Sequence, residues 1–142
     1  PCAVGVESTI LGMDGPPVLL RPGGISLEAI EAALGHPVQT PGDPARPIAP
    51  GQLASHYAPS AHVRLNVTTP LPGETFVTFG TPGALTLSAS GDLTQAAASL
   101  FHLLREADRI AGPTGTIAFA PIPEQGLGRA INDRLRRAAA PR

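Results

Sequence analysis

Hydrophobic residues recur at helical spacing in the second half of this 142-residue chain. Asp92 is a predicted N-cap, and Gln95 stands three residues later, where it completes a pattern like a capping box. Positions three and four apart then form one apolar face, made of Leu93, Ala97, Leu100, Leu104, Ala107 and Ala111. This spacing predicts a long amphipathic helix packed on a core.

Strand-like runs surround that helix. They lie at residues 63–67, 76–79, 84–87 and 116–120, and a second helix is predicted over 128–140. Because strands and helices alternate, we expect residues 63–142 to form a small Rossmann-like α/β accessory domain with a partly parallel sheet.

The first 38 residues predict a smaller set of elements. Strands are expected at 4–11 and 18–20, and turn residues lie between them. Ser26 is a predicted N-cap, and Gly35 is a natural residue to end the helix. Two strands and one short helix are too few to bury a core, so we expect residues 1–38 to pack on a further part of the protein.

Prolines dominate the segment between these units. Residues 39–62 contain prolines 41, 44, 47, 50 and 59 and lack a periodic hydrophobic pattern, which predicts an extended linker. Long loops without secondary structure are usually functional or disordered.

Composition narrows the range of functions. The formal net charge is −1, so a strong overall attraction for nucleic acid is not expected. A single cysteine excludes a disulfide framework and a multi-cysteine zinc site within one chain, and the four histidines lack metal-ligand spacing.

We expect a cytoplasmic protein without a membrane span or signal peptide. The chain begins at Pro1, so we expect an upstream part to precede it.

Three residues are candidates for ligand contacts. Ser8, in the run Gly5-Val6-Glu7-Ser8-Thr9, can bond a carboxylate or phosphate, or else satisfy backbone groups. Arg21, before Pro22-Gly23-Gly24, can present a fork of donors to phosphate, or be an ordinary surface arginine. Tyr57, in Ser55-His56-Tyr57-Ala58-Pro59, can lie against a nucleotide, or anchor the linker on a domain surface.

Two features near the C-terminus have simpler interpretations. Gly126-Leu127-Gly128 precedes a helix, as phosphate-binding loops do, but a tight start of the helix is the favoured interpretation. The last helix is basic, and we interpret it as a solvated face, with RNA contact as the alternative. Its charged residues are Arg129, Asp133, Arg134, Arg136 and Arg137, with Arg142 beyond it.

Taken together, these motifs resemble the threonylcarbamoyl-AMP synthase family in its two-domain form, which has a YrdC-like catalytic domain and a C-terminal accessory domain. The resemblance rests on the runs 1–10, 19–25, 49–51 and 56–59, in that order, and on 126–135 near the end. It implies that the chain comprises the C-terminal edge of a YrdC-like α/β domain, a linker that reaches over the active site, and the accessory domain. One departure is Gln52, where the family usually has methionine.

The family makes threonylcarbamoyl-AMP and pyrophosphate from L-threonine, bicarbonate and ATP, for threonylcarbamoyladenosine modification of tRNA. By resemblance, Ser8 contacts threonine, Arg21 and Tyr57 contact ATP, and magnesium arrives with the nucleotide. The resemblance also implies that the basic nucleotide-binding motif lies upstream of Pro1. We therefore assign no catalytic residue to this chain and expect it to be inactive alone. The alternative is a regulatory or tRNA- or nucleotide-binding module without chemistry of its own.

Overall fold

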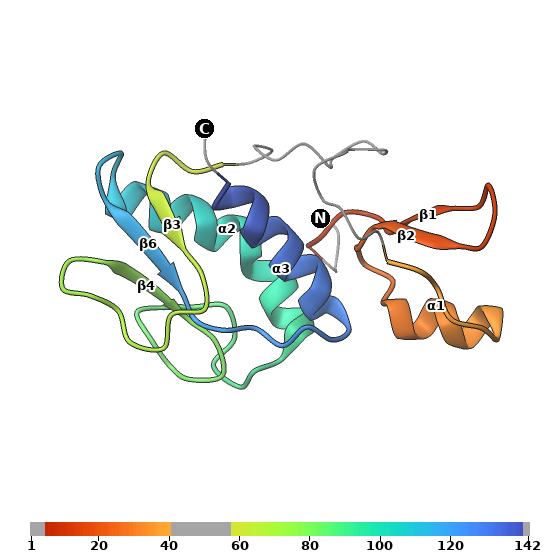
Figure 1. The fold of residues 1–142 in the computed structure, drawn as a ribbon. Coiled ribbons are helices and arrows are strands. Elements are labelled where there is room, and N and C mark those ends of the chain that lie inside the picture. The colour runs from red at the N-terminus through yellow and green to blue at the C-terminus, as the bar shows by residue number, and fades with distance from the viewer. Residues whose placement is uncertain (1–4, 41–57, 141–142) are drawn as a thin grey trace.

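The computed structural model describes residues 5–40 and 58–140, which form two units (Figure 1). The N-terminal unit is a hairpin of β1 (Ile10–Gly12) and β2 (Val18–Arg21) followed by α1 (Leu27–Leu34). Ser26 caps α1, since its side chain accepts from the Ala29 N–H at 3.2 Å. Gly35 ends α1 at a φ of 74°, a conformation that glycine adopts without strain.

The first strand is shorter than the sequence predicts, because it covers 10–12 and not 4–11. Backbone groups before Ile10 bond to the turn after β2 and not to a strand ladder. The Gly24 N–H donates to the Glu7 carbonyl at 3.0 Å, and Thr9 Oγ1 exchanges hydrogen bonds with both backbone groups of Ile25. Residues 7–9 are therefore fixed by a distant segment of the chain.

The C-terminal unit contains a four-stranded parallel sheet with the order β3-β6-β4-β5. Its elements are β3 (His62–Arg64), β4 (Thr75–Thr78), β5 (Leu85–Thr86), α2 (Leu93–Ala111), β6 (Thr116–Phe119) and α3 (Leu127–Ala138). Helix α2 contacts β4, β5 and β6, and α3 packs beside α2 (Figure 1). The Rossmann-like α/β prediction is confirmed, and the described strands of this sheet are all parallel.

The main core lies between this sheet and α2. Leu100 is fully buried on the predicted apolar face of α2, as are Ile117 and Phe119 on β6. Asp92 caps α2 by accepting from the Gln95 N–H at 2.8 Å. The Gln95 side chain, however, bonds Ser88 Oγ at 2.6 Å, and this hydroxyl accepts from the Asp92 N–H at 2.9 Å. Ser88, and not the Gln95 side chain, therefore accepts the hydrogen bond from the N-cap N–H that a capping box requires.

Residues just before the hairpin pack on the C-terminal unit. Val6 is 6% exposed and belongs to the main core, whereas the N-terminal unit has a small core of its own made of Leu19, Leu27 and Val38. A Cβ at Gly5 would lie 2.4 Å from the Ala97 carbonyl oxygen on α2, so only glycine permits this approach. The two units are therefore joined directly through the segment that precedes Ser8.

Within residues 5–40 and 58–140, the helices lack the combination of length and apolar character that a membrane span requires.

Candidate functional site

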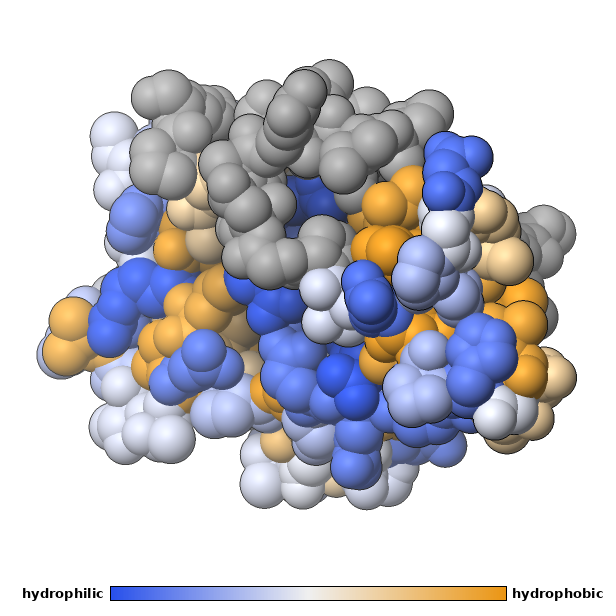
Figure 2. Space-filling view, turned by 45° about the vertical axis from the view of Figure 1, so that its right-hand side comes forward, coloured by the Kyte–Doolittle hydropathy of each residue, from blue (hydrophilic) through white to orange (hydrophobic). Residues whose placement is uncertain are grey.

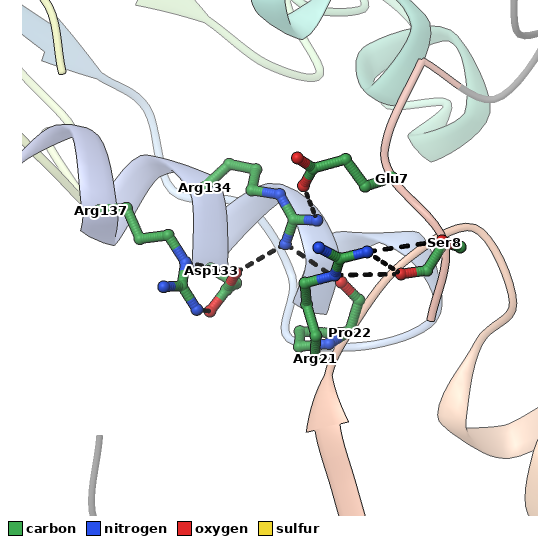
Figure 3. Close-up of polar contacts among 7 residues, drawn as sticks. All are labelled: Glu7, Ser8, Arg21, Pro22, Asp133, Arg134 and Arg137. Atoms are coloured by element: carbon green, nitrogen blue, oxygen red, sulfur yellow. Dashed lines mark hydrogen bonds and ion pairs between the residues drawn. The ribbon is translucent and has the colours of Figure 1, made fainter. Parts of the chain in front are cut away.

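Ser8 and Arg21 lie side by side at the open end of the hairpin (Figure 3). Arg21 donates to the Ser8 carbonyl oxygen from Nε at 3.2 Å and from Nη2 at 3.0 Å. Its Nη2 also lies 3.4 Å from Ser8 Oγ. Arg21 is 9% exposed, while Ser8 faces solvent. The structure thus brings together two of the three predicted ligand contacts, as a buried guanidinium beneath an exposed hydroxyl.

Close backbone packing fixes the position of Ser8 relative to Arg21. A Cβ at Gly23 would lie 2.3 Å from the Glu7 carbonyl oxygen and 2.4 Å from the Ser8 carbonyl carbon. Such contacts are too short for any side chain, so the turn after Arg21 needs glycine here because of space and not because of its φ angle. Gly23 therefore allows the turn after β2 to approach the backbone of residues 7–9 closely.

Arg134 on α3 is the residue of this region whose role the sequence interpretation missed. Its side chain is 3% exposed, so the expectation of a solvated arginine face is wrong at this position. It forms an ion pair with Glu7, donates from Nη1 to the Pro22 carbonyl at 3.1 Å and pairs with Asp133 Oδ2 at 2.6 Å (Figure 3). The contact with Glu7 is a charge–charge contact and not a directed hydrogen bond.

A signal for this burial exists in the sequence. Arg134 falls between Ile131, Leu135 and Ala138, which form the buried stripe of α3, at spacings of three and four. A charged residue on such a stripe is expected to be paired, because burial of an isolated charge is unfavourable.

The three other arginines of α3 also form ion pairs, and one of them, Arg136, pairs with Glu124 at 2.6 Å. Arg137 donates to both carboxylate oxygens of Asp133 at 2.9 Å, and its side chain is 13% exposed. Arg129 pairs with Glu28 of α1 at 2.9 Å across the two units. The Glu28 N–H and the Arg129 guanidinium lower the pKa of the Glu28 carboxyl. These pairings remove much of the positive surface that RNA contact by this helix would need.

Other sequence predictions can be placed as follows. Tyr57 lies outside the described residues. At Gly128, a Cβ would lie 1.9 Å from the Pro123 carbonyl oxygen, which confirms that this glycine serves a tight start of α3.

A small pocket opens at the carboxyl ends of β3 and β6 and is lined by residues including Asn66, Glu124 and Asn132. Asn132 donates to the Ile122 carbonyl at 2.9 Å, so its amide supports the loop before α3.

Hydrophilic residues gather near the middle of one face of the molecule, with hydrophobic residues on either side (Figure 2). The exposed large hydrophobic side chains include Met13, at 62%, and Ile25, at 61%, both in the N-terminal unit. Leu71, at 59%, and Ile110, at 51%, are similarly exposed in the C-terminal unit, and single exposed apolar side chains of this kind are common on protein surfaces.

The fold and the site define a class of protein in which a parallel α/β domain packs against a hairpin segment that carries an exposed hydroxyl above a buried guanidinium. Residues 25–140 match the family described as threonylcarbamoyl-AMP synthase, C-terminal domain. The chain belongs to this family.

Individual relatives agree with this assignment. The chain is similar to a threonylcarbamoyl-AMP synthase of Pyrococcus abyssi, with 36% identity over 160 residues, covering 96% of this chain and 46% of that protein. A Bacillus subtilis threonylcarbamoyl-AMP synthase is 32% identical over 166 residues, covering 100% of this chain and 47% of that protein. The crystal structure of P. abyssi Sua5 complexed with L-threonine superposes with a TM-score of 0.77 at 32% identity, covering 96% of this chain and 46% of that one. The chain thus spans about half the length of these relatives.

Proposed function

We propose that this chain is the C-terminal part of an L-threonylcarbamoyladenylate synthase, a nucleotidyltransferase that uses L-threonine, bicarbonate and ATP. The observation that supports this most directly is the Ser8–Arg21 pair in a chain of this family. In the proposed reaction, a carbamate oxygen of threonylcarbamate attacks the α-phosphorus of ATP. The bond between that phosphorus and the bridging oxygen of the β-phosphate breaks, and pyrophosphate leaves.

Ser8 is proposed to contact threonine. Its hydroxyl is exposed and lies close to Arg21 Nη2, so it can accept from the guanidinium and still donate its own proton. A donor directed to solvent suits the carboxylate of an amino acid. The related P. abyssi Sua5 forms a complex with L-threonine, which supports threonine as the substrate class.

Arg21 and Tyr57 are proposed to contact ATP. The Arg21 guanidinium is fixed by its hydrogen bonds to the Ser8 carbonyl, so it is preorganised to stabilise the developing charge of a phosphoryl-type transfer. Positioning and charge stabilisation supply most of the catalysis in such reactions. One arginine and one tyrosine cannot supply a complete nucleotide site, so we propose that the full-length protein completes it and that this chain alone is inactive.

The proposed domain organisation is residues 1–38 as the C-terminal edge of a catalytic domain, 39–62 as a linker over the active site, and 63–142 as the accessory domain. The small core of the N-terminal unit supports the first assignment, because elements that bury so few residues of their own need a further domain to pack on. The prolines of the linker support the second, since they keep the segment extended enough to cross a domain face.

Magnesium is proposed to arrive with ATP. Among the described residues, groups of three or more His, Cys, Asp or Glu that could hold a metal ion are absent. Glu7, the carboxylate adjacent to Ser8, is paired with Arg134. The described residues therefore do not fit a dedicated site, and no step is assigned to the metal. We also propose a cytoplasmic location and a product that passes to the tRNA-modification machinery.

The test uses the full-length protein. Pyrophosphate release is measured with L-threonine, bicarbonate and ATP, omitting each in turn, for the wild type and for Ser8→Ala and Arg21→Ala. We expect release that requires all three substrates. Ser8→Ala should raise the KM for threonine, and Arg21→Ala should raise the KM for ATP. Release that is independent of threonine in the wild type would contradict the proposed reaction, and unchanged KM values in both variants would contradict the residue roles.

A further inference from the structure

The buried Arg134 contacts the chain immediately beside both residues of the proposed ligand pair. Its ion-pair partner Glu7 is adjacent to Ser8, and its hydrogen-bond partner Pro22 is adjacent to Arg21. The two partners come from segments that also meet through the Arg21–Ser8 contacts, the bond from Gly24 to Glu7 and the hydrogen bonds between Thr9 and Ile25. One guanidinium of the C-terminal unit thus bridges the two segments that carry the pair (Figure 3).

The position of Arg134 is itself fixed within α3. Asp133 pairs with Arg134 and is held on its other side by both Nε and Nη2 of Arg137. The resulting chain of charges, Arg137–Asp133–Arg134–Glu7, contains two cations and two anions and is therefore neutral overall. A neutral, largely buried network of this kind has a defined geometry and adds little net field at the ligand pair.

We propose that Arg134 is a positioning residue for the proposed synthase: it sets the spacing and orientation of Ser8 and Arg21 through Glu7 and Pro22, and so links docking of the C-terminal unit to binding of both substrates. The inference rests on the proposed roles of Ser8 and Arg21. Its physical basis is that groups acting on the reacting centre must be held within fractions of an ångström of their productive positions.

Geometry distinguishes this role from a general stabilising one. Arg134 contacts Glu7 and the Pro22 carbonyl through different nitrogens of one planar fork, so it fixes the distance between the two segments. A lysine has a single ammonium that cannot reproduce the fork. The glutamine variant of Glu7 keeps the shape of the side chain and removes its charge.

The experiment measures the dissociation constants of threonine and ATP by calorimetry, and KM and kcat for pyrophosphate release, on the full-length protein. Arg134→Gln is compared with Arg134→Lys, with Glu7→Gln and with Arg109→Gln. Arg109 is a matched control, because it is an ion-paired arginine on α2 whose side chain is 70% exposed and whose partner, Glu106, lies on the same helix. All measurements are made well below the unfolding midpoint of each variant.

We expect Arg134→Gln to weaken binding of both substrates together and to lower kcat/KM by up to about 100-fold. Arg134→Lys should recover part of the loss, and Arg109→Gln should bind as the wild type does. A structural role alone would lower the folded fraction and leave the affinities of the folded protein unchanged. Unchanged affinities for both substrates in folded Arg134→Gln would therefore overturn the proposal.

Two further variants complete the design. If Arg134→Gln does not fold, Glu7→Gln decides the question, and unchanged affinities in that variant would overturn the proposal equally. Ser8→Ala and Arg21→Ala are measured in parallel. If they weaken binding while the Arg134 and Glu7 variants do not, only the positioning role is wrong. If they too leave binding unchanged, the proposed ligand roles are wrong and the positioning role falls with them.

Discussion

Gly23→Ala is a sharp test of how the turn after β2 supports the ligand pair. The added Cβ would lie 2.3 Å from the Glu7 carbonyl oxygen, 2.4 Å from the Ser8 carbonyl carbon and 2.4 Å from the Thr9 nitrogen. All three are backbone atoms, so no side chain can rotate away to make room. The backbone segments must separate by at least 0.7 Å to restore even a tight 3.0 Å contact with the carbonyl oxygen.

That separation stretches the hydrogen bond from Gly24 to Glu7, and it moves Arg21 away from Ser8. Overpacking that forces backbone shifts typically lowers the free energy of unfolding by about 1–3 kcal/mol. Misplacing positioning groups by a fraction of an ångström to an ångström lowers the rate by up to about 100-fold. We therefore expect Gly23→Ala to lower kcat/KM more than its loss of stability explains.

Gly15→Ala is the matched control. Gly15 lies in the turn of the same hairpin, and its Cβ would meet no described atom within 4 Å. Both variants are measured by urea denaturation and by pyrophosphate release in the full-length protein. If Gly23→Ala matches Gly15→Ala in stability and in kcat/KM, then the backbone of the hairpin accommodates the added Cβ without loss. The close contacts at Gly23 would then not support the ligand pair.

Three further predictions address the core, the junction of the units and the linker. Leu100→Ala should lower the free energy of unfolding by about 2–5 kcal/mol in urea denaturation, and the exposed control Leu71→Ala should change it by less than about 0.5 kcal/mol. The Glu28 backbone N–H and the Arg129 guanidinium lower the pKa of the Glu28 carboxyl, so this group stabilises the fold above its unfolded-state pKa of about 4.3 and loses that effect as the pH falls through its lower folded-state pKa; the stability lost in Glu28→Gln at neutral pH should therefore shrink as the pH is lowered below that range. A loss that does not change with pH would contradict the electrostatic role of the Glu28 carboxylate. Tyr57→Ala should weaken ATP binding by about 1–3 kcal/mol in calorimetry of the full-length protein, and Tyr57→Phe should weaken it by less. Unchanged ATP binding in Tyr57→Ala would contradict the proposed contact and would mean that the linker only connects the two domains.

Local signals predicted the helices well. Ser26 and Gly35 set the limits of α1, and Asp92 with the apolar spacing set the start and the buried face of α2. These signals act within a few residues, through caps and helical periodicity, so the sequence alone contains them. Arg21 and Ser8 are candidates from the sequence because a guanidinium or a hydroxyl at the end of a strand can contact a ligand, although each also has a structural explanation, and the family resemblance favours the ligand roles.

Long-range contacts account for what the sequence did not predict. The β-rich run before Ile10 forms no strand at residues 7–9, because their hydrogen bonds go to the turn at 22–25. Arg134 was assigned to a solvated face because neighbouring arginines suggested one, yet its burial depends on Glu7 and Pro22 near the other end of the chain. Its position on the apolar stripe of α3 was the available signal, but its partners could not be identified from spacing.

The energetics of the Arg134 network argue for a role in geometry and not in stability. The free-energy cost of removing two charges from water often offsets the attraction between them. Replacing a buried ion pair by hydrophobic residues therefore frequently leaves the stability of a protein unchanged or raises it. Arg134 is moreover imperfectly satisfied, since its buried Nε lacks a hydrogen-bond partner among the described residues. An apolar side chain on the stripe of α3 would hold the two units together at least as well. It would not, however, fix Glu7 and the Pro22 carbonyl at a set distance from each other. The feature that an arginine supplies here is simultaneous contact with two chain segments, at Glu7 and at Pro22, and these two residues are the neighbours of Ser8 and Arg21.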